Sequence, residues 1–262
     1  MQPAVSAEKA DSWAGLVLLY HRIATQDRDP WSLCVQPKHF EAHLQQLTTL
    51  AVGLDRVIKK VPPRRFVLLT FDDGYRDNLE CALPLMERYE VPGLVFVVTG
   101  PGSSFWWEHL ARQSDDPGFL QHYQELKRSE RPEVTPMPGV PHSRLTDGEL
   151  RQLGASPLIE LGAHTMSHSF LPALSPEVQQ EEILGSRDRL VQIVGAPVRS
   201  FAYPFGAYEP QTSQIVAQSG FEVAFTSSRG LWRSRSQRLC LPRVIVRDLT
   251  GSDFSACLAK WL

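Results

Sequence analysis

The 262-residue sequence lacks a basic run, a C-x-x-C pair and any apolar stretch long enough to span a bilayer. Its net charge of −2 argues against nucleic acid as the main partner. The four widely scattered cysteines favour reduced thiols over a disulfide framework. Residues 1–13 also lack the apolar core of a secretory signal, so we expect a cytoplasmic protein without a transmembrane segment. None of these features indicates the oligomeric state.

Short apolar runs rich in β-branched residues alternate with amphipathic segments along the chain. This alternation favours the α/β class, with a strand and a helix in each unit. A single barrel-like domain spanning residues 1–262 is the simplest arrangement, and a doubly wound open sheet is the alternative. The predicted strands are residues 16–20, 66–71, 94–98, 158–163, 200–203, 221–226 and 244–246.

Two of the predicted helices carry sequence signals at their ends. Thr146 and Glu149 have the spacing of a capping box. Ser175 and Pro176 suit the N-cap and first helical position of a helix that we expect to end near Val194.

Residues 101–143 interrupt this rhythm of strands and helices. They contain six prolines, mixed charge and the pair Trp106-Trp107. We predict that they form an insertion over one face of the domain, part of it helical.

Unusual polar residues follow several of the predicted strands. His21 comes directly after the first strand, Asp72 and Asp73 after the second, and His164 after residues 158–163, while Tyr203 closes another strand. The carboxyl ends of the strands in a parallel barrel share one face, and that face carries the active site. We therefore expect these side chains to gather in one place.

The sequence Asp72-Asp73-Gly74 has two interpretations. Adjacent carboxylates repel each other, a bound cation would relieve that repulsion, and Gly74 permits a tight turn. A capped turn without any metal is equally consistent with these three residues.

His164 and His168 are spaced so that both imidazoles can lie on one side of a single turn. Two histidines with one carboxylate form a set that hydrolytic zinc sites use, with one position left for water. The alternative is a pair of solvated loop histidines. His39 and His43 have the same spacing, but they lie in a predicted amphipathic helix without a carboxylate motif, so we predict solvated or capping histidines there.

These segments resemble the motifs of a known family. The sequences TFDDG at residues 70–74 and HTMSH at residues 164–168 are similar to the first two motifs of the polysaccharide deacetylases, the NodB-homology enzymes of carbohydrate esterase family 4. The sequence RSFAYPFG at residues 199–206 resembles the third motif. The resemblance implies a distorted (β/α)7-type barrel, with residues 101–143 inserted over the active-site face.

The resemblance also implies a role for each matched residue. Asp72 would be the general base, and Arg199 would pair with it and keep it ionised. The backbone N–H of Tyr203 would stabilise the oxyanion of the tetrahedral intermediate. The ligand type favours zinc, although cobalt, nickel or manganese could bind the same set. The implied metal ligands are Asp73, His164 and His168.

The sequence departs from the family pattern near its C-terminus. The family's aspartate-tryptophan motif and late acidic histidine are missing, because no histidine follows His168. The segment Leu18 to His21 instead resembles the circularly permuted branch that includes the poly-β-1,6-N-acetylglucosamine deacetylases, in which the acid comes from the first strand. His21 is therefore the predicted general acid, with a buried structural histidine as the alternative. Candidates to replace the missing motif are Asp27, Asp29, Trp31 and Arg243.

Aromatic side chains suit the apolar face of a sugar ring. Trp106 and Trp107, together with Trp31 and Pro204, are the predicted substrate-binding residues, although the tryptophan pair could also anchor the insertion. The predicted reaction is metal-dependent hydrolysis of an N-acetyl group on an amino sugar, sugar nucleotide, lipid-linked sugar or glycan. The alternatives are a deformylase, a cyclic-amide hydrolase and a non-catalytic carbohydrate-binding protein.

Overall fold

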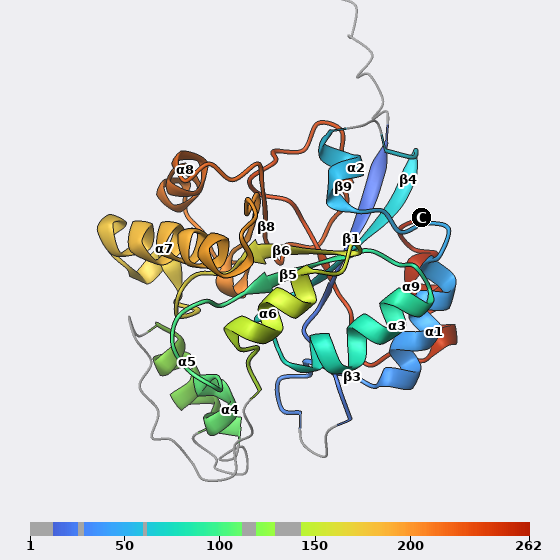
Figure 1. Cartoon of the computed structure of the whole chain (residues 1–262), viewed down its shortest axis with the longest axis horizontal. Coiled ribbons are helices and arrows are strands. Elements are labelled where there is room, and N and C mark those ends of the chain that lie inside the picture. The colour runs from blue at the N-terminus through green and yellow to red at the C-terminus, as the bar shows by residue number, and fades with distance from the viewer. Residues whose placement is uncertain (1–12, 26–28, 60–61, 112–118, 129–142) are drawn as a thin grey trace, which may run out of the picture.

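The seven strands predicted from the sequence form one curled, parallel sheet at the centre of the molecule (Figure 1). The structure is a computed structural model that describes residues 13–25, 29–59, 62–111, 119–128 and 143–262. Along the sheet the strands follow the order β10-β1-β4-β5-β6-β7-β8. Their bounds are β1 (Ala14–Tyr20), β4 (Arg65–Phe71), β5 (Gly93–Val97), β6 (Ile159–Ala163), β7 (Ser200–Ala202), β8 (Val223–Phe225) and β10 (Val244–Ile245).

The sheet curls far enough for its two ends to approach each other. At one end β10 pairs in parallel with β1, with Leu18 opposite Val244. At the other end Leu241, three residues before the start of β10, forms a parallel bridge with Phe225 of β8. This half-barrel confirms the predicted single α/β domain with a distorted (β/α)7-type barrel, rather than an open doubly wound sheet.

Three short strands were not predicted. β9 (Trp232–Arg233) pairs antiparallel with β1, and β2 (Arg22–Ile23) pairs with β3 (Cys34–Val35) in a separate ribbon. Two-residue strands carry too little periodicity to be recognised from sequence.

Helices surround the curled sheet (Figure 1). The signals at the helix ends predicted the boundaries well. The Thr146 capping box is present, and Ser175 caps a helix that ends at Val194 and is followed by Gly195 with a φ of 69°. The α-helices are α1 (Pro37–Leu47), α2 (Leu54–Ile58), α3 (Leu83–Arg88), α4 (Trp106–Ala111), α5 (Phe119–Arg128), α6 (Asp147–Gly154), α7 (Pro176–Val194), α8 (Pro210–Gln218) and α9 (Gly251–Leu258). Short π and 3-10 segments are η1 (Asn78–Ala82), η2 (Leu171–Ala173) and η3 (Pro204–Gly206).

The segment predicted as an insertion supplies α4 and α5. Two parts of this segment, residues 112–118 and 129–142, lie outside the described residues. In Figure 1 the two helices lie together at one side of the domain.

The strands are buried on both faces, and their side chains divide between two hydrophobic clusters. In β4, Val67 and Leu69 belong to the cluster that packs under the helices, whereas Phe66 and Leu68 belong to a second cluster inside the curl. Because successive side chains of a strand point to opposite faces, this alternation identifies which residues look into the barrel. Thr70 and Asp72 continue the inward row.

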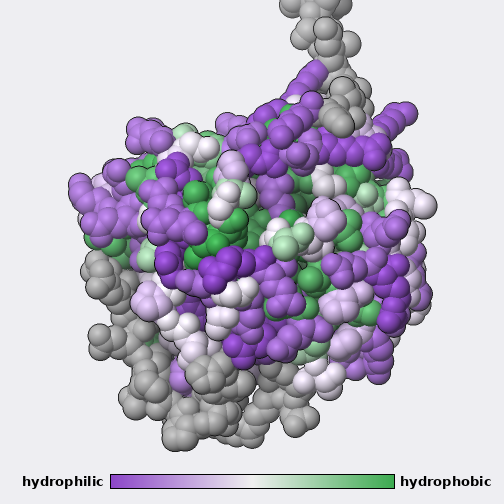
Figure 2. All heavy atoms as spheres, in the orientation of Figure 1, coloured by the Kyte–Doolittle hydropathy of each residue, from purple (hydrophilic) through white to green (hydrophobic). Residues whose placement is uncertain are grey.

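The outer surface is mainly hydrophilic on the face shown in Figure 2, with hydrophobic residues in smaller groups. Among the described residues, the large hydrophobic side chains that are exposed are Tyr208 and Ile245. None of the helices in the described part of the chain combines the length and apolar character needed to cross a bilayer.

His43 corrects one prediction. It is fully buried rather than solvated, its ring stacks on Phe254 at 3.9 Å between centroids, and its Nε2 bonds to the carbonyl of Leu249 at 2.8 Å. His39 does contact solvent and pairs with Asp248 at 2.7 Å.

Candidate active site

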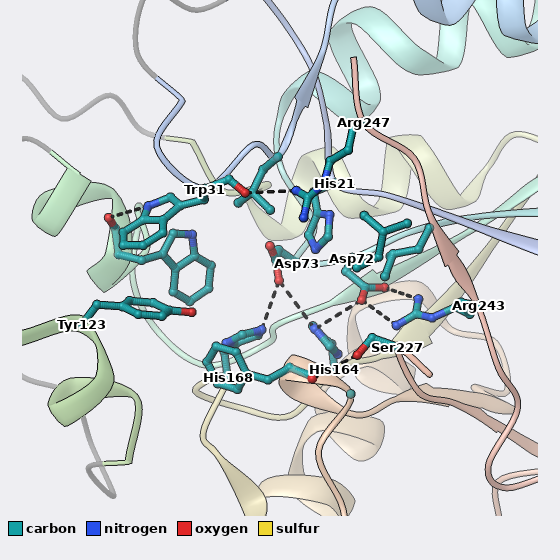
Figure 3. Close-up of a pocket in the computed structure, with 16 residues that line it drawn as sticks. His21, Trp31, Asp72, Asp73, Tyr123, His164, His168, Ser227, Arg243 and Arg247 are labelled. Carbon is teal, nitrogen blue, oxygen red and sulfur yellow. Dashed lines mark hydrogen bonds and ion pairs between the residues drawn. The ribbon is translucent and has the colours of Figure 1, made fainter. Parts of the chain in front are cut away.

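A cavity of about 220 Å³ lies at the carboxyl ends of the parallel strands. Polar side chains at the ends of four strands line it: His21 after β1, Asp72 and Asp73 after β4, His164 after β6, and Ser227 after β8 (Figure 3). The strand-end argument is therefore correct for these residues, since the fold brings them to one face.

Asp73, His164 and His168 form a compact group of potential metal ligands. Their ligand atoms all lie within 4.8 Å of one another, and the three side chains are buried. The Oδ1 atom of Asp73 is 3.5 Å from Nε2 of His164 and 3.3 Å from Nε2 of His168 (Figure 3). A turn with positive φ at Asp73 (77°) and at Gly74 (82°) directs the carboxylate toward the histidines.

The protonation of this group suits a divalent cation. Nδ1 of His164 lies 2.7 Å from the carbonyl oxygen of Ala202, so Nδ1 donates the hydrogen, and in the neutral ring Nε2 keeps its lone pair for the site. Burial would lower the pKa of His164, but Asp72 and Asp73 outweigh it and raise that pKa. Burial lowers the pKa of His168 to about 3, which keeps this imidazole neutral. Burial would raise the pKa of Asp73, but the neighbouring His164, His168 and His21 outweigh it and the pKa falls to about 2. Oδ1 of Asp73 and Nδ1 of His168 are buried without a hydrogen-bond partner among the described residues.

Asp72 is held by an arginine on the side away from the metal ligands. The Arg243 guanidinium forms two parallel hydrogen bonds to the Asp72 carboxylate, both 2.7 Å long. Arg243 also donates to the hydroxyl of Thr70 at 3.2 Å and to the carbonyl of Thr226 at 2.8 Å. Burial alone would raise the pKa of Asp72, but Arg243 and His164 hold that pKa below its ordinary value. The carboxylate is therefore ionised.

His21 lines the same cavity as these groups, and Figure 3 shows its ring above Asp72 and Asp73. Burial lowers its pKa, while the carboxylates of Asp73 and Asp72 act in the opposite direction. The side chain of Asn78 donates to the carbonyl of His21 at 2.9 Å and fixes the backbone at this strand end.

Aromatic residues from distant parts of the sequence form one wall of the cavity. Trp31 donates from Nε1 to the carbonyl of Trp107 at 3.2 Å, and its ring centroid lies 4.4 Å from that of Tyr123 on α5. The Trp107 ring packs on His168 at 4.6 Å, and Phe205 packs on His168 at the same distance. Figure 3 shows Trp31 and Tyr123 beside the His168 end of the cavity.

Comparison with known proteins agrees with this geometry. A family model described as polysaccharide deacetylase matches residues 59–224, which is more than half of the chain. The chain belongs to the polysaccharide deacetylase family. This membership confirms the resemblance seen in the motifs, and it makes the chain a member of a family of hydrolases.

Individual relatives extend the likeness beyond the matched region. The Bacillus subtilis (strain 168) protein YxkH, named as a polysaccharide deacetylase, is 27% identical over 250 residues, covering 92% of this chain and 74% of the relative. A Staphylococcus aureus poly-β-1,6-N-acetyl-D-glucosamine N-deacetylase is 20% identical over 86% of this chain and 69% of its own length.

Two solved structures share the fold. IcaB from Ammonifex degensii has a TM-score of 0.69 at 22% identity, covering 96% of this chain and 97% of its own. The Streptococcus pyogenes deacetylase PplD has a TM-score of 0.70 at 21% identity, covering 93% of this chain and 97% of its own.

The predicted pairing of Arg199 with Asp72 is wrong in this family member. Arg199 binds Glu160 at 2.8 Å and Asp55 at 2.5 Å instead. It precedes β7 and shares the outward face of that strand with Phe201, so its side chain points away from the barrel interior. Arg243 occupies the position that the resemblance assigned to Arg199.

The role predicted for Tyr203 is also wrong. Its backbone N–H donates to the carbonyl of Phe225 at 3.0 Å, and its buried hydroxyl donates to the carbonyl of Leu239. Pro204 is buried and does not line the cavity, whereas Phe205 and Gly206 do. The chain turns there with a φ of 58° at Phe205.

The remaining predicted residues divide between the site and its surroundings. Trp31 and Trp107 line the cavity, but Trp106 does not: it packs on Tyr123 behind the wall. Asp29 accepts hydrogen bonds from the backbone N–H groups of Leu33 and Cys34 and caps a turn. Asp27 lies outside the described residues.

The cavity lining includes residues that were not predicted as part of the site, among them Tyr123, Phe205 and Arg247. Phe205 stands between Pro204 and Gly206 of the third motif, so the motif itself was a usable signal. Tyr123 lies on a helix and Arg247 is exposed, and neither belongs to a motif. The sequence therefore contains no comparable signal for them.

Proposed function

We propose that this chain hydrolyses the acetamide of an N-acetylated amino sugar within a glycan. A divalent metal would be held by the three ligands described above, with Asp72 as base and His21 as acid. The observation that carries the proposal is their convergence: His21 from β1 and Asp72 from β4 line one cavity with all three ligands.

The residues present fit a metal ion. Two imidazoles and one ionised carboxylate face a common point, and the buried Oδ1 of Asp73 has no other partner among the described residues. Zinc is the expected ion from the ligand type, with cobalt, nickel or manganese as substitutes. When bound, such an ion would polarise the amide carbonyl and make a water molecule more acidic.

The protein side chains then divide the proton transfers between them. Asp72 is ionised and oriented by Arg243, and it accepts a proton from the attacking water. His21 delivers a proton to the amine nitrogen, so that the amine leaves as a neutral group. Burial lowers its pKa, while the carboxylates of Asp73 and Asp72 favour the protonated ring that this step requires, and the ring regains its proton from water after each turnover.

A backbone donor completes the arrangement. Among the described residues, no acceptor binds the N–H of Phe205, whose residue lines the cavity next to His168. We assign to it the oxyanion contact that the resemblance gave to Tyr203.

The substrate follows from the cavity and from the relatives. A volume of about 220 Å³ is below the ~300–1,000 Å³ of pockets that enclose whole drug-sized ligands. It suits one sugar unit, with neighbouring units outside. The aromatic wall of Trp31, Trp107 and Tyr123 offers a face for the sugar ring. Because one relative is a poly-β-1,6-N-acetyl-D-glucosamine N-deacetylase, β-1,6-linked N-acetylglucosamine oligomers are the first substrates to test.

The test is release of acetate from such oligomers by the Zn²⁺-loaded protein, with β-1,4-linked oligomers, formamido sugars and cyclic imides in parallel. Acetate release from an N-acetylated sugar, absent in Asp72→Asn, is the expected result. Preference for the formamido sugar or the imide would replace the proposal with a deformylase or a cyclic-amide hydrolase. A protein that binds no divalent metal and releases nothing would refute it.

A further inference from the structure

A buried glutamate on α7 makes contacts that neither the motifs nor the proposed reaction explain. Glu182 is 9% exposed, while its neighbour Glu181 faces solvent. Its carboxylate points at the loop that joins β6 to η2 and carries both metal-ligand histidines. The two elements are adjacent in space, since α7 packs against β6.

That loop has an unusual backbone. Thr165 and His168 both adopt positive φ values, 66° and 59°, although neither is a glycine. Such conformations cost free energy in L-residues and persist only where the surroundings hold them. Within the loop, the hydroxyl of Thr165 accepts from the N–H of His168 at 2.9 Å. The bond lies within the loop, and the backbone N–H groups of Met166 and Ser167 find their hydrogen-bond acceptor outside the loop.

Glu182 satisfies three of those groups at once. Its Oε2 accepts the backbone N–H of Met166 at 3.0 Å and that of Ser167 at 2.9 Å. Its Oε1 accepts the hydroxyl of Ser167 at 2.7 Å. Two successive N–H groups aimed at one oxygen form a concave anion site, here filled by a side chain of the same protein. All three donors lie between His164 and His168 in the sequence.

The helix gives this contact a rigid base. α7 runs for 19 residues, is capped by Ser175 at its start, and ends at Val194, with Gly195 as its C-cap. One turn beyond Glu182, the hydroxyl of Thr99 reaches the Ser186 carbonyl at 3.5 Å, and the Gly100 N–H donates to the Met166 carbonyl at 2.7 Å. The loop is therefore clamped between α7 and the end of β5.

We propose that Glu182 is a positioning residue of the metal centre, which holds the loop in the one conformation that directs His164 and His168 at the same ion. The inference rests on the metal site of the proposed function. Groups that orient metal ligands from outside typically change metal affinity by about 10–100-fold when they are removed.

The chemistry of the contact predicts how variants behave. In Glu182→Gln, the amide oxygen can still accept both backbone N–H groups. The new NH₂ can donate to the Ser167 hydroxyl, which then turns its hydrogen to the Ser169 hydroxyl 2.7 Å away. Glu182→Ala removes every acceptor. Glu182→Asp is shorter by one methylene group and cannot keep both oxygens in place.

The experiment measures affinity for Zn²⁺ alone, by competition with a chromogenic chelator, on metal-stripped protein at a temperature where circular dichroism shows each variant folded. Glu181→Ala, the exposed neighbour, is the matched control. We expect about 10–100-fold weaker binding for Glu182→Ala. Glu182→Gln and Glu181→Ala should stay close to the unmodified protein.

Two results would overturn the inference: unchanged Zn²⁺ affinity in folded Glu182→Ala, or a loss in Glu182→Gln as large as that in Glu182→Ala. If Glu182→Ala does not fold, Glu182→Asp decides, and unchanged affinity there counts against the inference. Failure of the unmodified protein to bind any divalent metal would instead refute the proposed function, so the two failures are distinguishable.

Discussion

Arg243 and Arg199 offer a direct test of which arginine serves the base. In Arg243→Met, Asp72 would remain 4% exposed but lose the guanidinium that holds its pKa low. Breaking a buried pair from one side costs about 3–5 kcal/mol, out of a total stability of about 5–15 kcal/mol for a domain. Desolvation then raises the pKa of Asp72, because no guanidinium remains to oppose the cost of burying its charge.

The sign of the pH dependence follows from this change. With Arg243 present, the low pKa of Asp72 stabilises the fold above the pKa of the unfolded chain, and this contribution is lost as the pH falls. With Arg243→Met, the raised pKa means that Asp72 binds a proton more readily in the folded state. The stability gap between the two proteins should therefore be largest near neutral pH and should narrow as the pH falls toward 4.

The assay is the pH profile of kcat/KM for acetate release, together with urea unfolding at several pH values. Arg243→Met should move the acidic limb to higher pH. Arg199→Met is the matched control: its ion pairs are partly exposed, so it should cost about 0–1 kcal/mol and leave the profile unchanged. A shifted limb in Arg199→Met, or an unshifted one in Arg243→Met, would refute the assignment.

Three further predictions concern single side chains. His21→Ala should lower kcat on an N-acetyl sugar by about 10²–10⁴-fold. The kcat on 4-nitrophenyl acetate should hardly change, because its leaving group needs no proton. Equal losses of kcat on both substrates would argue against an acid role for His21. Asp72→Asn should abolish turnover of both substrates while Zn²⁺ affinity, measured by chelator competition, persists; substantial turnover would exclude Asp72 as the base. Burial lowers the pKa of His43 to about 4. The free energy of unfolding, measured in urea, should therefore fall by up to about 3 kcal/mol between pH 6.5 and pH 4. The same dependence of the unfolding free energy on pH in His43→Gln would contradict this.

The sequence predicted most of the barrel because buried strands and capped helices leave local signals. All seven core strands were found within about two residues, since each is an apolar run bounded by turn residues. The predicted metal ligands come together for a related reason: Asp73, His164 and His168 directly follow strands or belong to one short motif.

The predicted partner of Asp72 was wrong because successive side chains of a strand point to opposite faces of the sheet, and Arg199 lies on the outer face. Arg199, Phe201 and Tyr203 are two residues apart, so they share one face of β7, and apolar Phe201 places that face against the helices. Arg243 reaches the site because β10 pairs with the end of β1, a long-range contact that no local pattern specifies. Parity could have excluded Arg199, but only the fold could supply Arg243.

The two adjacent carboxylates differ because the chain turns between them. Asp72 ends the inward row of β4 and meets Arg243, whereas the positive φ of Asp73 swings its carboxylate to His164 and His168. Each buried charge thus faces a different partner: Arg243 for Asp72 and, in the proposed function, a metal ion for Asp73. With neutral histidines the group formed by Asp72, Asp73 and Arg243 carries a net charge of about −1, and a divalent ion would make it about +1. A site that becomes positive only when the metal binds would stabilise the oxyanion that develops during the reaction. Asp72 would stay ionised as the base, because its charge is neutralised by Arg243 and not by the metal.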